Sequence, residues 1–394
     1  MTFLELLFWI LIGLVFYSYI GYGLVLYTLV SIKRWLSKPK AEYDDNYEPE
    51  VTLLIAAYNE LDYIDQKVKN TRSLDYPSHK LKQLWVTDGS DDGTPDLLQK
   101  YTGLTVLHRP ERNGKIAAIN RAMQTVNSPI VIFSDANTDL GHESIRRIVA
   151  LFRDPKTGGV SGEKRIIAHK SEDAAVAGES LYWKYESMLK RWDAQLNSTV
   201  GAAGELFAIR TELFQETEKD TLLDDFMIAM RIAMKGYSIQ YDPEAYAIES
   251  ASADVSEELK RKIRISAGGI QSVFRLLPLL NVFKYKTLSF QYISHRVLRW
   301  IPAPLALIVI LVLNAILIPQ GLVYWYAFIA QAVAYTFALI GWLAQKRKIR
   351  IKVFFVPYYF VVMNYAMIKG MVRYGLNTQS VNWERAARGK ATVG

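Results

Sequence analysis

The hydrophobic pattern separates apolar ends of the chain from a middle in which polar and apolar residues alternate. Residues 3–32 form one nearly continuous apolar run, long enough to cross a bilayer as a tilted helix. Three more apolar segments lie near the other end, residues 297–318, 321–345 and 351–375, and the first two are joined by a tight turn at Pro319. The ends therefore predict membrane helices, and the middle predicts a separate globular domain.

Basic residues predict how the first apolar segment is oriented. Lys33, Arg34, Lys38 and Lys40 follow it directly, and such residues stay on the cytoplasmic side. No small-residue cleavage site follows, which favours a retained anchor over a signal peptide. The middle is thus expected in the cytosol.

Four full crossings would place the basic C-terminal tail outside, so residues 351–375 are expected to enter the membrane and return, or to lie shallowly.

Strand and helix patterns alternate through the middle of the chain. Apolar strands are expected at residues 51–58, 81–88, 104–109 and 129–135, with helices near 60–72, from Pro95 and over 116–126. This alternation predicts an α/β fold with a mostly parallel, doubly wound sheet covered by helices on both faces. Ligands bind such a sheet at the carboxyl ends of its strands. The mixed basic and aromatic stretch before residue 297 predicts helices in the headgroup plane.

Composition narrows the function classes. The formal charge of +8 over 394 residues is concentrated beside apolar segments, as at residues 346–352, so membrane topology and anionic lipid explain it better than nucleic acid. The absence of cysteine excludes disulfides and thiolate catalysis, and the five histidines have no metal-binding spacing. Any metal ion must be held by oxygen ligands.

Four polar clusters follow successive predicted strands. They are residues 58–60, Asp88, residues 112–115 and residues 135–137. Each alone has an ordinary explanation as a helix cap or turn. Together, at one edge of a parallel sheet, they suggest a site for a nucleoside diphosphate.

The order of these clusters resembles glycosyltransferase family 2, whose domains have the GT-A fold, over about residues 51–271. The family's xYNE turn is matched by Ala57, Tyr58, Asn59 and Glu60. Its DDGSxDGT-like turn is matched by TDGSDDGT, which begins at Thr87 where the family has an acid. The resemblance implies that Ala57, Tyr58 and Glu60 bind the nucleotide and that Asp88 carries most of the base recognition.

Two further motifs extend the resemblance. RNGKIAAIN, from residue 112, is similar to the family's GK-containing loop, which implies that Asn113 and Lys115 face uracil or the diphosphate. SDANT stands in place of the DxD motif, which implies that Asp135 and Asn137 hold Mg²⁺ or Mn²⁺. Because Asn137 is neutral, we expect weak metal binding without nucleotide, so that the metal enters with the donor.

The acceptor side has its own motifs. GAAGELFAIR resembles the acceptor-side loop and following strand, which implies that Gly204 and Glu205 lie near the acceptor. Asp224 and Asp225 could simply stabilise a helix N-terminus. They also resemble the family's ED pair, whose second acid, here Asp225, is the general base. A like charge at Asp224 would raise the pKa of one of the pair.

The motif of processive family members is altered in this chain. In place of QxxRW stand Arg261, two residues, Arg264 and Ile265. The resemblance implies that Arg264 faces the diphosphate and Arg261 the acceptor, but the missing tryptophan argues against long-chain synthesis. The tail segment NWERAARGK is similar to the family's, and its Trp383 could return to the acceptor or anchor at the interface.

The resemblance, with flanking segments like those of hyaluronan, poly-N-acetylglucosamine and cellulose synthases, implies an inverting membrane glycosyltransferase. It would transfer sugar from a UDP-sugar to a polysaccharide or oligosaccharide at the cytoplasmic face of a bacterial inner membrane. Three alternatives remain open: transfer of one sugar to a polyprenyl-phosphate or other lipid-linked acceptor, a nucleotidyltransferase, and a non-catalytic export component. The expected domains are an N-terminal membrane helix (1–35), a linker (36–50), the GT-A domain (51–271), interfacial helices (272–296), membrane helices (297–375) and a cytosolic tail (376–394).

Overall fold

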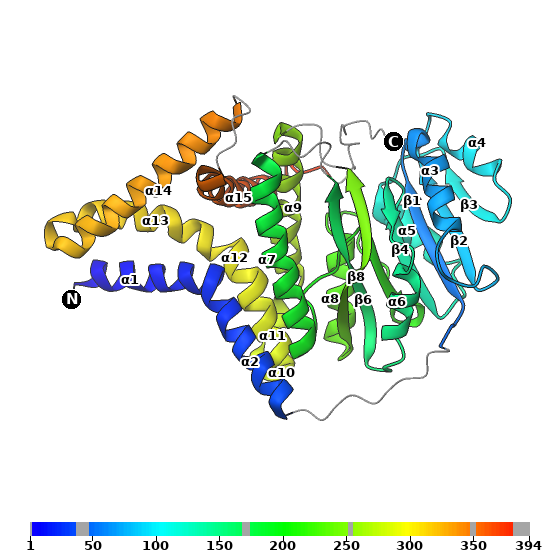
Figure 1. Ribbon diagram of the computed structural model, residues 1–394, viewed down its shortest axis with the longest axis horizontal. Helices are drawn as coiled ribbons and strands as arrows, with labels where there is room; N and C mark the ends of the chain where they lie inside the picture. Colours follow the sequence, from blue (N-terminus) through cyan, green and yellow to red (C-terminus); the bar gives the residue numbers. More distant parts are fainter. Residues whose placement is uncertain (1, 37–46, 168–173, 251–254, 347–351, 381–394) are drawn as a thin grey trace. The chain divides into compact units, whose positions relative to one another are not determined.

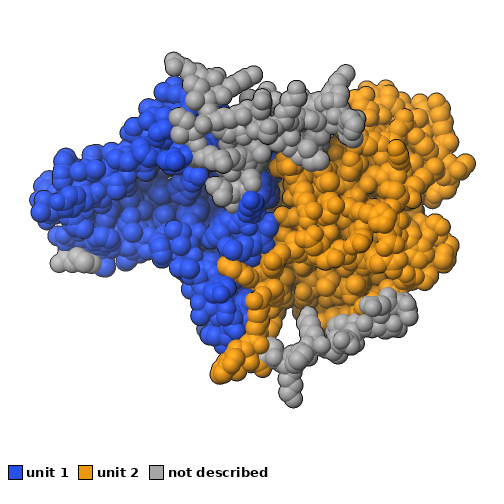
Figure 2. Space-filling model, in the orientation of Figure 1, with its two compact units in different colours: residues 1–32, 168–189, 254–379 blue, residues 33–167, 190–253, 380–394 orange. Residues whose placement is uncertain are grey.

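The chain forms two compact units whose segments interleave along the sequence. The computed structural model describes residues 2–36, 47–167, 174–250, 255–346 and 352–380. The helical unit comprises residues 1–32, 168–189 and 254–379 (Figure 2). The sheet unit comprises residues 33–167, 190–253 and 380–394. Each unit is therefore built from segments far apart in the sequence.

The sheet unit contains an eight-stranded sheet in the order β3-β2-β1-β4-β7-β6-β8-β5 (Figure 1). The strands are β1 (Val51–Ala57), β2 (Leu81–Asp88), β3 (Leu104–Arg109), β4 (Ile130–Asp135), β5 (Thr138–Leu140), β6 (Thr157–Ile167), β7 (Leu206–Arg210) and β8 (Ser238–Ser250). Strands β3, β2, β1 and β4 are parallel, as predicted. Strand β7 is antiparallel to β4 and β6, β8 is parallel to β6, and β5 is antiparallel to β8. The α/β class is confirmed, and the sheet is mixed beyond β4.

Helices cover both faces of this sheet. They are α3 (Leu61–Arg72), α4 (Thr94–Gln99), α5 (Lys115–Met123), α6 (Ser144–Leu151) and α8 (Asp224–Met234). Alternate residues of β1, such as Leu53 and Ile55, share a core with Ile64 of α3 and Ile148 of α6. The intervening β1 side chains point to the other face, where α5 packs. All seven β1 residues are buried, which explains the near-continuous apolar run in the sequence.

The helical unit holds the apolar segments. Its helices include α1 (Phe3–Phe16), α2 (Tyr22–Leu36), α7 (Ala174–Leu196), α9 (Val255–Arg275), α10 (Val282–Tyr285), α11 (Thr287–Tyr292), α12 (Leu298–Trp300), α13 (Pro302–Leu317), α14 (Leu322–Lys346) and α15 (Lys352–Gly375). Among the described residues, four helical stretches are long and apolar enough to cross a membrane: Phe3–Leu36, Pro302–Gln320, Leu322–Gln345 and Val353–Gly375.

Two expectations about these segments can be compared with the structure. The tight turn at Pro319 is confirmed as a short 3₁₀ helix, Ile318–Gln320, between α13 and α14. Helix α15 is one continuous helix with Pro357 inside it. Residues 352–375 therefore do not form a segment that enters the membrane and turns back. A shallow helix, the other expected arrangement, is compatible with it.

Among the residues that the structure describes, two short π-helical segments interrupt the helical unit, and the hydrophobic pattern did not predict them. The first, η1 (Tyr17–Gly21), lies between α1 and α2, and the second, η4 (Ile293–Val297), lies between α11 and α12. A π segment inserts an extra residue per turn and redirects the side chains around it. Both segments contribute to the cavity described below.

Candidate functional site

The end of β4 and the starts of α5 and α8 bring three charged side chains together. Lys115 Nζ donates to Asp135 Oδ1 at 2.8 Å and lies 3.9 Å from Asp224 Oδ2. Burial acts to lower the pKa of Lys115, but the carboxylates of Asp135 and Asp224 outweigh it and raise that pKa well above its usual range. The ammonium therefore stays charged, at the edge of the sheet where the sequence predicts a diphosphate.

Asp225 lies beside this cluster on the first turn of α8. Its Oδ1 accepts a hydrogen bond from the Phe226 backbone N–H at 2.8 Å. A Cβ atom added to Gly204 would lie 3.2 Å from Asp225 Oδ2, so a glycine lets the loop before β7 approach the carboxyl group closely. Burial, and then the like charge of Asp224, raises the pKa of Asp225 to about 7. Asp225 can therefore exchange a proton near neutral pH.

A buried ion pair network adds negative charge to the site. Lys164 on β6 is paired with both Glu205 and Glu249. The charge of Glu205 helps to raise the pKa of Asp135, after burial, which is the larger cause. Glu205 is thus beside the predicted site, but its charge is shared with Lys164. Sequence reasoning did not identify Lys164 or Glu249, because strands β6 and β8 carry no motif at these positions.

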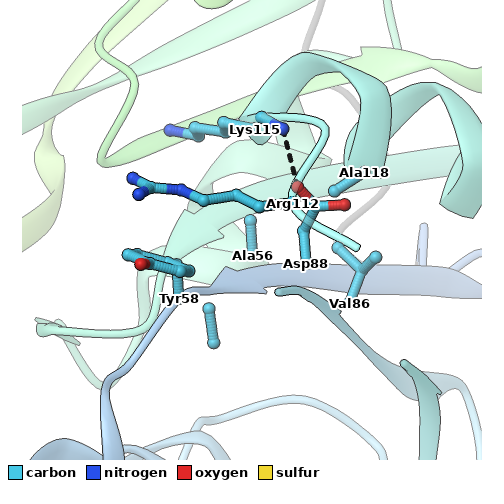
Figure 3. A pocket seen from close by; sticks show the side chains of 9 residues that line it. Ala56, Tyr58, Val86, Asp88, Arg112, Lys115 and Ala118 are labelled. Carbon is cyan, nitrogen blue, oxygen red and sulfur yellow. Dashed lines mark hydrogen bonds between the residues drawn. The ribbon is translucent and has the colours of Figure 1, made fainter. Parts of the chain in front are cut away.

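Asp88 shapes the loop that carries Lys115. Its Oδ2 accepts the backbone N–H groups of Asn113 at 2.7 Å and Gly114 at 2.6 Å, and the second bond is drawn in Figure 3. Gly114 has φ of 92°, a conformation that favours glycine. The structure therefore brings together Asp88, Asn113 and Lys115, three residues predicted to bind the nucleotide. A hydrogen bond joins the Asp88 carboxylate to the Asn113 backbone.

A small pocket lies beside this loop, lined by Ala57, Tyr58, Asp88, Arg112 and Lys115 among others. The Arg112 guanidinium carbon lies 4.0 Å from the centre of the Tyr58 ring. Figure 3 shows the side chains of Tyr58, Arg112 and Lys115 extending side by side in one direction. A flat ring and cations at this spacing suit a nucleobase next to a diphosphate.

Of the predicted metal ligands, Asp135 is the last residue of β4, and Asn137 lies on the turn between β4 and β5. Asn137 is buried, and its Oδ1 has no hydrogen-bond partner among the described residues. Its Nδ2 lies 3.5 Å from Oε1 of the buried Glu60. Helix α6 begins seven residues later with Glu143 as N-cap, so this turn is not a helix cap.

Lys67 of α3 donates hydrogen bonds to residues on both sides of this turn, and sequence reasoning did not identify it. It is 1% exposed, and its Nζ donates to Ser134 Oγ at 2.8 Å and to the Thr138 carbonyl at 2.6 Å. Burial lowers the pKa of Lys67 to about 7. A lysine in an amphipathic helix such as α3 ordinarily faces solvent, so no sequence signal marked this one.

Three predicted site residues are not placed with this cluster. Arg261 and Arg264 lie on α9, in the helical unit, and the guanidinium of Arg261 donates to Glu258 with two bonds of 3.0 Å. Trp383 lies outside the described residues. Their parts in donor or acceptor binding stay predictions.

The chain is similar to known glycosyltransferases. Residues 52–217 match the family model of Glycosyl transferase family 2. The chain is 25% identical over 240 residues to a poly-β-1,6-N-acetyl-D-glucosamine synthase of Staphylococcus aureus, covering 57% of this chain and 56% of that relative. It is 27% identical over 205 residues to a β-monoglucosyldiacylglycerol synthase of Nostoc, covering 49% of this chain and 43% of that relative. The chain therefore spans about half the length of these relatives.

A solved structure extends the similarity to most of the chain. The mannosyltransferase PcManGT of Pyrobaculum calidifontis, in complex with GDP-Man and Mn²⁺, is 25% identical, with a TM-score of 0.70. The match covers 94% of this chain and 99% of that one. The fold predicted by resemblance, GT-A with flanking helices, is confirmed.

Proposed function

We propose that this chain transfers a sugar from a nucleotide-sugar to an acceptor hydroxyl with inversion. Residues 52–217 match the family model of Glycosyl transferase family 2, which supports the proposal. The observation that carries the proposal is the cluster of Lys115, Asp135, Asp224 and Asp225 at the carboxyl ends of the parallel strands. It combines a permanent cation, oxygen ligands and a carboxyl group that titrates near neutral pH. These are the groups that diphosphate departure and proton abstraction require.

Asp225 is the proposed base. Its carboxylate takes the proton of the acceptor hydroxyl while that oxygen forms a bond to the anomeric carbon. The bond from that carbon to the diphosphate oxygen breaks, and the nucleoside diphosphate leaves with the electron pair. A pKa of about 7 makes Asp225 a stronger base than an ordinary aspartate and still leaves much of it ionised at neutral pH.

Lys115 and the residues at the end of β4 are proposed to stabilise the negative charge that develops on the leaving group. Asp135 and Asn137 offer a carboxylate and a buried carbonyl oxygen, and these two oxygen ligands would hold one Mg²⁺ or Mn²⁺ ion. When bound, that ion neutralises phosphate charge. Among the described residues no group of three or more His, Asp or Glu side chains could hold a metal.

The donor is proposed to be a UDP-sugar, with the base against Tyr58 and Asp88 and the diphosphate toward Lys115. The place of these residues in the family's motifs supports this, and all three line the same small pocket. The Pyrobaculum structure holds GDP-Man, so a guanine nucleotide belongs in the same assay. The four apolar helical stretches, with Lys33 and Arg34 in the last turn of the first, support transfer at the cytoplasmic face of a membrane, proposed to be a bacterial inner membrane.

The acceptor is proposed to be a polysaccharide or oligosaccharide, as the name of the Staphylococcus relative suggests. A second candidate is a single transfer to a lipid-linked acceptor. Two observations favour it: Ile265 in place of the family's tryptophan, and the likeness to a β-monoglucosyldiacylglycerol synthase. Sizing the labelled product formed in membranes from UDP-sugars and GDP-mannose separates the two, because only the first gives a ladder of chain lengths.

The proposed role of Asp225 is tested with Asp225→Asn in the full-length protein. We expect donor affinity within about twofold of wild type and transfer reduced by a factor of about 100 or more, because only proton abstraction is removed. Asp96→Asn, an exposed acid on α4, is the matched control and keeps full turnover. Retention of more than about a tenth of wild-type turnover by Asp225→Asn would place the base elsewhere.

A further inference from the structure

The helical unit contains a cavity of about 370 Å³, which the proposed transfer reaction does not use. Four segments far apart in the sequence line it: η1, α7, the stretch from η4 to α12, and α15. Its size lies within the range of natural ligand sites. Both π-helical segments of the described helical unit contribute side chains, Tyr19 and Ile20 from η1 and His295 and Arg296 from η4. Such segments occur frequently at functional sites.

One wall of the cavity is cationic. His295, Arg296 and Arg299 line it, and no acidic residue is among its lining residues. Behind them lies the buried Glu186 of α7, whose carboxylate is 2.5 Å from Arg299 Nη1, 3.4 Å from Arg296 Nη1 and 3.3 Å from His295 Nε2. His295, Arg296 and Arg299 therefore share the Glu186 carboxylate, which holds these basic side chains at the edge of the cavity.

Polar contacts fix the shape of this wall. Tyr185 Oη donates to the Tyr19 carbonyl at 2.7 Å, inside the π segment where the regular helical bonding pattern changes. Tyr19 Oη donates in turn to Asn364 Oδ1 of α15 at 2.6 Å. The Arg299 guanidinium carbon lies 5.7 Å from the centre of the Tyr19 ring. The protein's own contacts therefore hold the cationic wall in shape.

The apolar part of the lining comes mainly from α15. Val356, Phe360, Met363 and Met367 line it, at the spacing of one helix face. Methionine side chains adapt to flexible apolar ligands. The cavity lining thus combines basic and apolar side chains, within a unit that holds four candidate membrane helices.

We propose that this cavity binds the phosphate group of a lipid, with the phosphate against Arg296 and Arg299 and the start of the chain along α15. Guanidinium groups bind phosphate through paired charge-assisted hydrogen bonds, and an uncharged glycan would gain little from two of them. Burying cations near a bilayer is costly, and a lipid phosphate offsets that cost. The ligand class is an anionic phosphate on an apolar tail, found in membrane phospholipids and in polyprenyl phosphates. This inference goes beyond the proposed transfer reaction, because it concerns binding in the other unit.

The test measures lipid binding by native mass spectrometry of the full-length protein in neutral detergent. The probes are phosphatidylglycerol, a polyprenyl phosphate, and diacylglycerol, which has acyl chains but no phosphate. We expect at least one phosphate lipid to bind roughly tenfold or more tightly than diacylglycerol. A preference for phosphatidylglycerol identifies a structural phospholipid site, and a preference for polyprenyl phosphate identifies a carrier-lipid site. Both outcomes support the proposal.

Two variants locate the binding. Arg296→Gln keeps the 2.5 Å pair between Glu186 and Arg299 and should weaken phosphate-lipid binding roughly tenfold. Met363→Trp fills the apolar side without changing charge and should weaken it as well. Lys284→Gln, on α10 and outside the cavity lining, is the matched control and should bind as wild type. Thermal unfolding confirms that each variant is folded.

Three results would overturn the proposal. The first is equal binding of all three lipids, which would mean that acyl chains alone fill the space. The second is wild-type phosphate-lipid affinity in both Arg296→Gln and Met363→Trp while the proteins remain folded. The third is displacement of bound lipid by a soluble oligosaccharide, which would make the cavity part of a glycan path. None of these outcomes depends on catalysis, so failure here is distinguishable from failure of the proposed transfer activity.

Discussion

The charge of Asp224 should set the pH at which the proposed base becomes active, and Asp224→Asn removes that charge with little change in volume. Asp224 is the second cause, after burial, that raises the pKa of Asp225 from 3.8 to about 7. The whole rise corresponds to about 4 kcal/mol of preference for the protonated form. Since burial remains in the variant, only part of the rise is lost. We expect the pKa of Asp225 to fall by about one unit, or about 1.4 kcal/mol.

The assay is the pH dependence of kcat/KM for the nucleotide-sugar, which reports ionisation in the free enzyme. The sign follows from the role of Asp225 as a base: activity is present above its pKa and is lost as pH falls through it. In wild type the acid limb should have its midpoint near pH 7, so activity at pH 6 is about a tenth of the plateau. In Asp224→Asn the midpoint should lie about one unit lower, with about half of the plateau left at pH 6.

Each enzyme is normalised to its own plateau, because Asp224 also lies 3.9 Å from Lys115 and its loss lowers the maximal rate. Asp96→Asn serves again as the charge control and should leave the midpoint unchanged. An unchanged midpoint in Asp224→Asn, or a shift to higher pH, would refute the reasoning. It would mean either that Asp225 is not the titrating base or that the two carboxyl groups do not interact.

Two further predictions concern the turn that follows β4. Asp135→Ala should abolish metal-dependent donor binding. Asn137→Asp should tighten Mn²⁺ binding about tenfold in the absence of nucleotide, because it adds a charged ligand. If calorimetry shows the same Mn²⁺ affinity for Asn137→Asp as for wild type, Asn137 is not a ligand of the metal. Lys67→Met should lower the thermal-unfolding midpoint, because it leaves the Thr138 carbonyl without its buried donor, at a cost of about 1–3 kcal/mol. The pKa of Lys67 is lowered to about 7 in the folded state, so the wild-type protein gains stability as pH rises above 7. The stability difference between wild type and Lys67→Met should therefore grow between pH 7 and pH 9. Lys69→Met, which changes an exposed lysine of the same helix, should show neither effect.

Local signals in the sequence were enough to predict the parallel half of the sheet and its edge of polar clusters. Strands β1 and β4 are near-continuous apolar runs because both of their faces are covered, whereas β3 lies at the edge of the sheet and is only half-buried. Each of the strands β1 to β4 is followed by a polar turn. Side chains that follow successive parallel strands must gather at one edge, so the sequence alone was enough to group Asp88, Lys115 and Asp135. The apolar segments were equally clear, since their length alone marks them.

Other features depend on contacts between distant segments, which no local pattern records. The antiparallel insertion of β7 between β4 and β6 places Gly204 against Asp225, and it results from pairing across some 70 residues of intervening chain. Lys67 has the sequence context of a solvated helix residue, and only the packing of α3 under the β4–β5 turn buries it.

The division between sequence and tertiary structure is clearest in the charged residues. The basic and aromatic stretch before residue 297, which includes His295, was expected to lie in the headgroup plane, where solvated or headgroup contacts suffice. The fold instead turns His295, and Arg299 just after that stretch, inward against Glu186, more than 100 residues away, where both line a cavity. A sequence determines which residues carry charge and which segments are apolar. The tertiary structure decides which charges are buried together, because the energy of a buried charge depends on its partners in space and not on its neighbours along the chain.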